Sequence, residues 1–81
     1  MDHDRIVRQA VADFTGRAPE ALAAETRLDD PDMLDSLSKV AVITQVEAET
    51  GLRLPDDAAA AADTVGALVA LCERLAAADP G

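Results

Sequence analysis

Apolar residues recur every three or four positions along most of this chain, which is the spacing that places side chains on one face of a helix. The pattern predicts helices over residues 4–15, 36–50, 56–62 and 64–77. No run of residues alternates between apolar and polar positions as a half-buried strand would. We therefore expect an all-α fold in which residues 1–81 form one domain.

Residues that begin and end helices stand at the expected boundaries. Asp35 precedes the second helix, where its carboxylate can accept a backbone N–H, and Gly51 follows that helix as a stop signal. Asp56 is the equivalent capping candidate for the third helix, and either Asp63 or Thr64 for the fourth. These signals support the bounds drawn from the apolar pattern.

The segment between the first two helices, residues 17–34, contains two prolines and an acidic cluster, which favour a long connection. One helical turn is expected at residues 19–22. Leu22, Leu28 and Leu34 are expected to hold this loop against the core. The third helix is so rich in alanine that we expect it to be short and weakly anchored.

The second helix carries more apolar residues than one buried stripe can hold, at positions 37, 40, 41, 42, 43 and 46. We expect Val42 and Val46 to lie in the core and some of the others to point outward. In the fourth helix Cys72 falls on the apolar face and is expected to be a small core residue.

Composition and charge exclude several classes of function. A domain of 81 residues has a small core without a deep active-site cavity. Phe14 is the only aromatic residue, so single-stranded nucleic acid finds no stacking platform. Sixteen acidic and seven basic residues give a net charge of -9, which repels nucleic acid and anionic membranes and attracts basic protein surfaces. With no leader or membrane span in the sequence, we expect a soluble cytoplasmic protein.

An enzyme or a metal centre gains little support from the residues. The only histidine, His3, lies near the N-terminus, so Ser36 as a nucleophile lacks a base. The aspartates at positions 29, 30, 32 and 35 lack the glycine and glutamate spacing of a calcium-binding loop. We expect these aspartates to form a solvated acidic segment.

Ser36 is the candidate for chemistry because it stands in the first turn of the second helix, directly after the long loop. A hydroxyl in that place is expected to be exposed. A phosphodiester built on it would lie against unpaired N–H groups and the positive end of the helix dipole. Serine also begins many helices without any further role, so position alone leaves both interpretations open.

The tripeptide Asp35-Ser36-Leu37 resembles the attachment motif of acyl carrier proteins and related thiolation domains. The resemblance extends over nearly the whole chain, on both sides of the motif. The further positions that carry it are residues 25–28, Val40, Val42, Val46, Glu47, the turn at 51–56 and residues 64–68.

This resemblance implies a small four-helix bundle of the acyl-carrier type, with a long loop between its first two helices. It implies that a phosphopantetheinyl transferase attaches 4'-phosphopantetheine from coenzyme A to Ser36 with the help of magnesium. Asp35 would then cap the helix and contact the transferase's magnesium, although a cap alone also explains this residue. The arm would carry acyl intermediates as thioesters, and the chain would be a non-catalytic carrier.

The resemblance also places Leu37, Val40 and Glu47 toward partner enzymes, with Ile43 adding to the same surface. Packing under the long loop remains an equal interpretation for Leu37 and Ile43. The implied partners are acyltransferase, ketosynthase or ligase-type enzymes in fatty acid, polyketide or antibiotic biosynthesis, and the acidic net charge indicates that their docking surfaces are basic. We expect the carrier to be a monomer, and its high alanine content and its excess of arginine over lysine indicate a bacterial source. An aminoacyl or peptidyl carrier and an unmodified helical interaction module remain the alternatives.

Five residues depart from the family pattern. Met33 stands where glycine is frequent, and Ser38 and Lys39 follow where acids are frequent, which makes the second helix less negative than the net charge suggests. Thr50 and Ala62 replace larger apolar residues, and either leave room between helices or let their neighbours collapse inward. The set of partners is therefore expected to be specialised.

Overall fold

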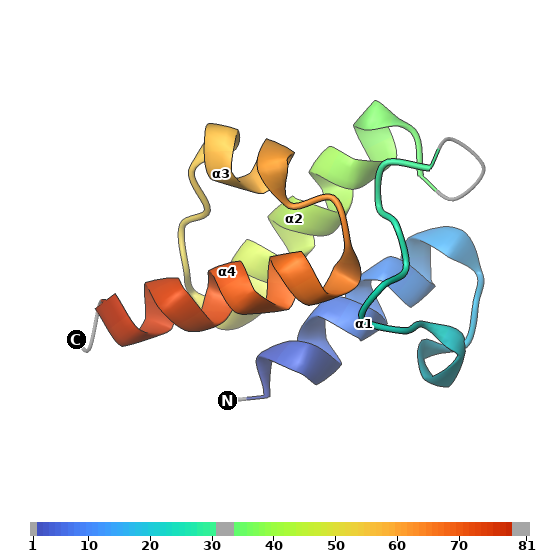
Figure 1. Cartoon of the computed structure of the whole chain (residues 1–81), viewed down its shortest axis with the longest axis horizontal. Helices are drawn as coiled ribbons and strands as arrows, with labels where there is room; N and C mark the ends of the chain where they lie inside the picture. Colours follow the sequence, from blue (N-terminus) through green and yellow to red (C-terminus); the bar gives the residue numbers. More distant parts are fainter. Residues whose placement is uncertain (1, 31–33, 79–81) are drawn as a thin grey trace.

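The computed structural model describes residues 2–30 and 34–78, which form a bundle of helices (Figure 1). Its elements are α1 (His3–Thr15), the one-turn helix η1 (Pro19–Ala21), α2 (Ser36–Thr50), α3 (Asp56–Ala61) and α4 (Val65–Ala78). The four α-helices begin and end within one residue of the predicted bounds. The predicted all-α fold with a short third helix is confirmed, and the described ranges contain no strand. Asp32, which belongs to the predicted acidic segment, and Met33, which departs from the family pattern, lie outside the described residues.

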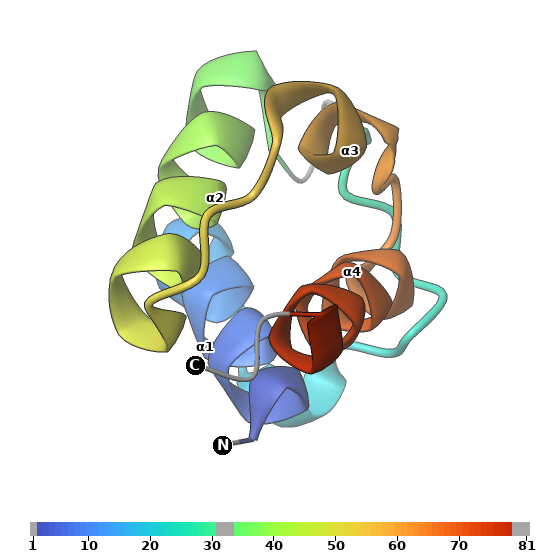
Figure 2. The same ribbon diagram turned by 90° about the vertical axis from the view of Figure 1, so that its left-hand side faces the viewer.

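Most of the core is assembled from aliphatic side chains of the three longer helices. α1 packs against both α2 and α4, and α3 packs against α4 (Figure 2). Val42 and Val46 of α2 are fully buried, as predicted, and so is Cys72 of α4. The single aromatic residue, Phe14, remains 43% exposed at the end of α1, so the interior contains no ring.

The described part of the α1–α2 loop is held to the bundle by side chains and by backbone hydrogen bonds. Its three buried leucines, each at most 4% exposed, are Leu22, Leu28 and Leu34. The N–H of Leu28 donates to the Asp63 carbonyl at 2.8 Å, and the N–H of Val65 donates to the Thr26 carbonyl at 3.0 Å. These contacts confirm the predicted anchoring of the loop and join it to the start of α4.

Gly66, in the first turn of α4, permits this close contact between loop and helix. Its N–H donates to the Ala24 carbonyl oxygen at 2.8 Å. A Cβ atom at position 66 would lie 3.0 Å from that same oxygen. Any side chain there would therefore push the loop away from α4.

The ends of α1 and α2 follow the sequence signals. Gly16 and Gly51 close these helices in the left-handed conformation, with φ angles of 74° and 73°. The Gly51 N–H donates to the Glu47 carbonyl at 2.8 Å. Glycine adopts this conformation without the steric penalty that a Cβ atom brings, so each helix stops where the sequence places the glycine.

The starts of α3 and α4 answer the two remaining capping predictions. The prediction that Asp56 caps α3 is wrong, because Asp56 is already the first helical residue and Pro55 before it has no side-chain acceptor. At α4 the cap is Thr64 and not Asp63, since the Thr64 hydroxyl oxygen accepts the N–H of Ala67 at 3.0 Å. α3 thus begins without the side-chain hydrogen bond that α2 and α4 have.

Replacing Leu28 by alanine is expected to lower the free energy of unfolding by about 2–5 kcal/mol, because the truncated side chain leaves a cavity under the loop. Urea unfolding followed by far-ultraviolet circular dichroism measures this change. The matched control is Leu37→Ala, which removes the same atoms from a side chain that is 81% exposed. It should change the free energy by no more than about 0.5 kcal/mol. A loss of stability in Leu28→Ala as small as that expected for the control would show that Leu28 does not anchor the loop.

Candidate functional site

Ser36 is the first residue of α2, at the point where the α1–α2 loop enters the helix (Figure 1). The residue is exposed. A modifying enzyme can therefore reach its hydroxyl group, whereas a serine buried inside the bundle would be closed to covalent chemistry. The predicted exposure of this hydroxyl is confirmed.

Asp35 fixes the start of α2 next to this serine. Its Oδ1 atom accepts the backbone N–H of Ser38 at 2.7 Å, which is the predicted capping bond. Hydrogen bonds from the Ser38 N–H and hydroxyl hold the pKa of the Asp35 carboxyl below its usual value. The carboxylate is therefore ionised at neutral pH, and it engages a first-turn N–H group that would otherwise be open to an anion.

A groove opens beside Ser36, between α2 and α3, with a volume of about 380 Å³. Val40 and Ile43 form part of its α2 wall, Ala59 lies on the α3 wall, and Leu54 lines it near the α2–α3 connection. These side chains make the groove largely apolar. Ser36 thus stands at a place where a group attached to its hydroxyl has an apolar channel beside it.

Lys39 crosses this groove close to the serine. It lies three residues after Ser36, hence on the same side of α2, and both residues line the groove. Its Nζ atom donates to the carbonyl oxygen of Ala60 in α3 at 3.3 Å. The sequence marked Lys39 as a departure from the family pattern but gave no sign of this bond, which depends on where α3 lies.

The exposed apolar residues of α2 are Leu37, at 81% exposure, and Val40, at 60%. Leu37 therefore does not pack under the loop, which removes that interpretation for this residue. Ile43 is half-buried and packs against the core while also lining the groove. We call the surface made by Leu37 and Val40 the apolar patch.

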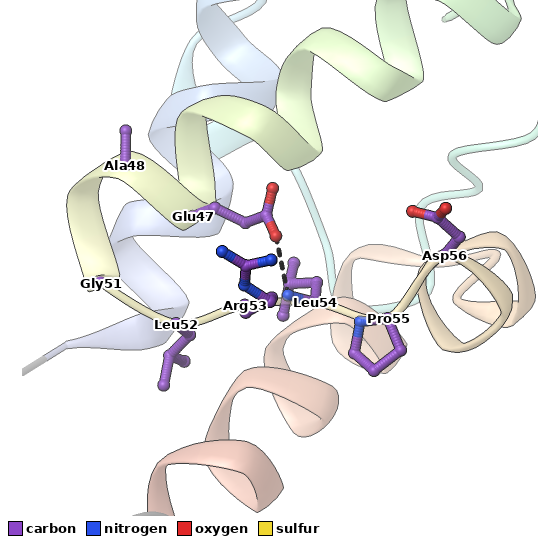
Figure 3. A pocket seen from close by; sticks show the side chains of 8 residues that line it. All are labelled: Glu47, Ala48, Gly51, Leu52, Arg53, Leu54, Pro55 and Asp56. Atoms are coloured by element: carbon purple, nitrogen blue, oxygen red, sulfur yellow. Dashed lines mark hydrogen bonds between the residues drawn. The ribbon is translucent and has the colours of Figure 1, made fainter. Parts of the chain in front are cut away.

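Glu47 has a structural contact that sequence reasoning missed. Its Oε2 atom accepts the N–H of Leu54 at 2.8 Å, which ties the α2–α3 connection back onto α2 (Figure 3). A second, open pocket of about 660 Å³ surrounds this bond. It is lined by Glu47 and Ala48 of α2 and by the residues from Gly51 to Asp56. The Glu47 side chain was predicted to face partners, and in the structure its carboxylate is engaged by the chain's own backbone.

Thr50 and Ala62, the two small residues that suggested room between helices, do not line the groove. The Thr50 hydroxyl donates to the Val46 carbonyl at 2.7 Å, and its oxygen accepts the N–H of Leu52 at 3.2 Å. Ala62 is 5% exposed and belongs to the core. Neither position therefore adds room to the groove.

Other kinds of site find no support among the residues that the structure describes. There, no three His, Cys, Asp or Glu side chains lie together as metal ligands would. Burial raises the pKa of the Cys72 thiol, which keeps it in its unreactive form. Within residues 2–30 and 34–78, no helix has the length and apolar character needed to cross a membrane.

Comparisons with known proteins agree with this arrangement. The family described as "Phosphopantetheine attachment site" matches residues 5–72 of the chain. An acyl carrier protein of Rhodococcus erythropolis is 35% identical over 67 residues, which make up 83% of this chain and 74% of the relative. A meromycolate extension acyl carrier protein of Mycobacterium bovis is 32% identical over 69 residues, or 85% of this chain. The match spans 60% of the length of that mycobacterial relative.

The Asp35 cap predicts a pH dependence of stability with a defined sign. The folded-state pKa of Asp35 is lower than the ordinary value of 3.8, so the ionised carboxylate stabilises the fold at every pH above that value. This contribution is lost as the pH falls through the folded-state pKa. Titration of the side-chain carboxyl signals by nuclear magnetic resonance (NMR) measures the pKa of Asp35, which should lie below 3.8.

Two substitutions separate the cap from the charge. At neutral pH, Asp35→Ala is expected to lower the melting temperature, whereas Asp35→Asn keeps a capping acceptor and should lose less. The control Asp57→Ala removes the same charge from an exposed residue inside the first turn of α3. A melting temperature that falls equally in Asp35→Ala and Asp57→Ala would contradict the capping role.

Proposed function

The chain belongs to the acyl carrier protein family, and we propose that it carries acyl and polyketide intermediates as thioesters on an arm attached to Ser36. As a member of this family it is a non-catalytic carrier with covalently attached 4'-phosphopantetheine. The observation that carries the assignment to Ser36 is its exposure in the Asp35-Ser36-Leu37 motif at the start of α2.

The residues around Ser36 suit the attachment of such an arm. The hydroxyl is exposed and stands beside a groove whose walls are largely apolar. When bound, the arm supplies a terminal thiol that holds cargo as a reactive thioester. The protein's part is to hold the attachment point rigidly at a helix start, so that the tethered cargo reaches partner active sites at high effective concentration.

We assign Asp35 a second role during attachment, as a contact for the magnesium ion of the phosphopantetheinyl transferase. Its Oδ1 atom is occupied by the Ser38 N–H, and its low pKa keeps the carboxylate ionised at neutral pH. Ionised carboxylates are the protein ligands that magnesium uses. One side chain can therefore cap the helix and present negative charge beside the hydroxyl that is modified.

The assignment of acyl rather than aminoacyl or peptidyl cargo is supported by the relatives, which are named as acyl carrier proteins. The match spans 60% of the Mycobacterium bovis relative. The pathway and the partners of the present chain are therefore part of the proposal. Enzymes that load, extend or release acyl groups, such as acyltransferases, ketosynthases and ligases, are the partners that fit such a cargo.

The apolar patch is the surface that we assign to these partners. Leu37 is the residue next to the attachment point and Val40 lies one turn further along α2. Both side chains are more than half exposed, so a partner that covers them gains buried apolar area without disturbing the core.

Incubation with coenzyme A, magnesium and a phosphopantetheinyl transferase is expected to add the mass of one phosphopantetheine group to the wild-type chain. Ser36→Ala should gain nothing, because the attachment oxygen is absent. Intact-mass spectrometry measures both. The matched control is Ser38→Ala, which removes the other serine of the same turn and should still be modified.

A wild-type chain that stays unmodified, while a known carrier in the same tube is converted, would contradict the proposal and favour an unmodified interaction module. Modification of Ser36→Ala would place the arm elsewhere.

Substitutions in the apolar patch test docking separately from attachment. Leu37→Ala and Val40→Ala are each expected to lower the transferase's kcat/KM for the chain by roughly five- to thirtyfold, equivalent to about 1–2 kcal/mol. The control Phe14→Ala removes an apolar side chain that is also exposed but lies on α1. An unchanged kcat/KM in both α2 variants, with all proteins folded by circular dichroism, would exclude the patch as the docking surface.

A further inference from the structure

Lys39 is the only lysine of the chain and the only charged residue of α2 between Ser36 and Val46. It lies one helical turn after Ser36 and lines the same groove. The residue is half-buried and its ammonium group reaches across to α3. A single positive charge therefore stands between the attachment point and the α3 wall.

The contact that Lys39 makes does not neutralise its charge. Its hydrogen-bond partner is the backbone carbonyl of Ala60, a neutral acceptor, at 3.3 Å. A carbonyl near the end of a short helix attracts a cation only weakly, and a full negative charge within reach forms the stronger hydrogen bond. Together with a hydrogen bond from Arg27, the charge of Lys39 also lowers the pKa of Asp29. An anion placed beside Ser36 would therefore compete with that carboxylate and with the Ala60 carbonyl for the ammonium group.

A phosphodiester on Ser36 would bring a negative charge to a helix start where the Asp35 carboxylate already engages one of the first-turn donors. The N–H of Ser38, which helix geometry makes a natural anion donor, is already taken by Asp35 at 2.7 Å. The Asp35 carboxylate also repels a neighbouring anion, and the chain as a whole carries a net charge of -9. The flexible ammonium group of Lys39 is the cation on the same face of α2 that can offset this repulsion.

We propose that Lys39 is a positioning residue that pairs with the phosphodiester of the arm and directs the arm along the α2–α3 groove. The inference rests on the proposed attachment at Ser36. Pairing on the groove side of α2 orients the first bonds of the arm toward α3. The Leu37 side chain of the apolar patch then stays free for partners while the arm is held on the neighbouring face.

The experiment uses the holo-protein with a nitroxide spin label on the arm's thiol. Cys72 is fully buried and its pKa is raised, so the labelling reagent reacts with the arm. Paramagnetic broadening of the amide signals of Ala59 and Ala60 reports the arm in the groove. Leu37, next to the attachment point, serves as the internal reference because the length of the arm limits how far the nitroxide can move from its amide.

In wild type, Ala59 and Ala60 are expected to broaden strongly relative to Leu37. Lys39→Gln should reduce this relative broadening by roughly two- to fivefold, which is the range for an exposed ion pair, and Lys39→Arg should retain it. Raising the salt concentration should reduce the broadening in wild type but not in Lys39→Gln. The control Arg74→Gln removes one positive charge from α4, whose C-terminal end lies far from the start of α2 (Figure 1), and should have no effect.

A second measurement uses the single lysine directly. With ¹⁵N-lysine labelling, the one side-chain Nζ signal should shift when the arm is attached, because its partner changes from a carbonyl to a phosphodiester. Intact-mass spectrometry shows whether the arm is attached, and so separates a failure of the Lys39 proposal from a failure of the proposed function. A chain that carries the arm but shows equal broadening in wild type and Lys39→Gln, with an unmoved Nζ signal, overturns the role of Lys39 alone. A chain that never acquires the arm overturns the proposed function and this inference together.

Discussion

The attachment of the α1–α2 loop to the start of α4 is the constraint on which the rest of the structure depends. Backbone hydrogen bonds from Leu28 to Asp63 and from Val65 to Thr26 fix the loop, and its leucines bury themselves in the core. Because the loop leads into Asp35, its path decides where α2 begins and which end of the bundle presents Ser36. The exposed hydroxyl is thus positioned by contacts between segments that are far apart in sequence.

Features that depend on local sequence were predictable, and those that depend on how helices meet were not. Helix bounds followed from apolar spacing and from terminal glycines such as Gly51, both of which act within a few residues. The bonds from Leu54 to Glu47 and from Lys39 to Ala60 depend instead on the return of the chain after α2. Periodicity tells which face a side chain occupies, but it does not tell which backbone atom that face will meet.

The net charge of -9 describes the chain poorly at the proposed docking surface. The first eleven residues of α2 include no acid, and the large apolar side chains exposed there are Leu37 and Val40. The acids of α2, Glu47 and Glu49, lie in its last turn, and the others lie outside this helix, where they act on partners over roughly a Debye length. At the proposed docking surface, charge would therefore govern how a basic enzyme approaches, while the close contact with α2 would be apolar. This division is consistent with a carrier that meets several enzymes and holds none of them tightly.

α3 differs from the other helices in how little holds it. It has six residues, no side-chain cap, and a single buried residue, Ala59. Segments with few buried contacts open at a small fraction of the global free energy of unfolding. The α3 wall of the groove is therefore compliant, while the wall formed by α2 is rigid because Val42 and Val46 anchor it in the core. Local opening of this one alanine-rich turn would change the width of the groove without disturbing the interior that keeps the protein folded.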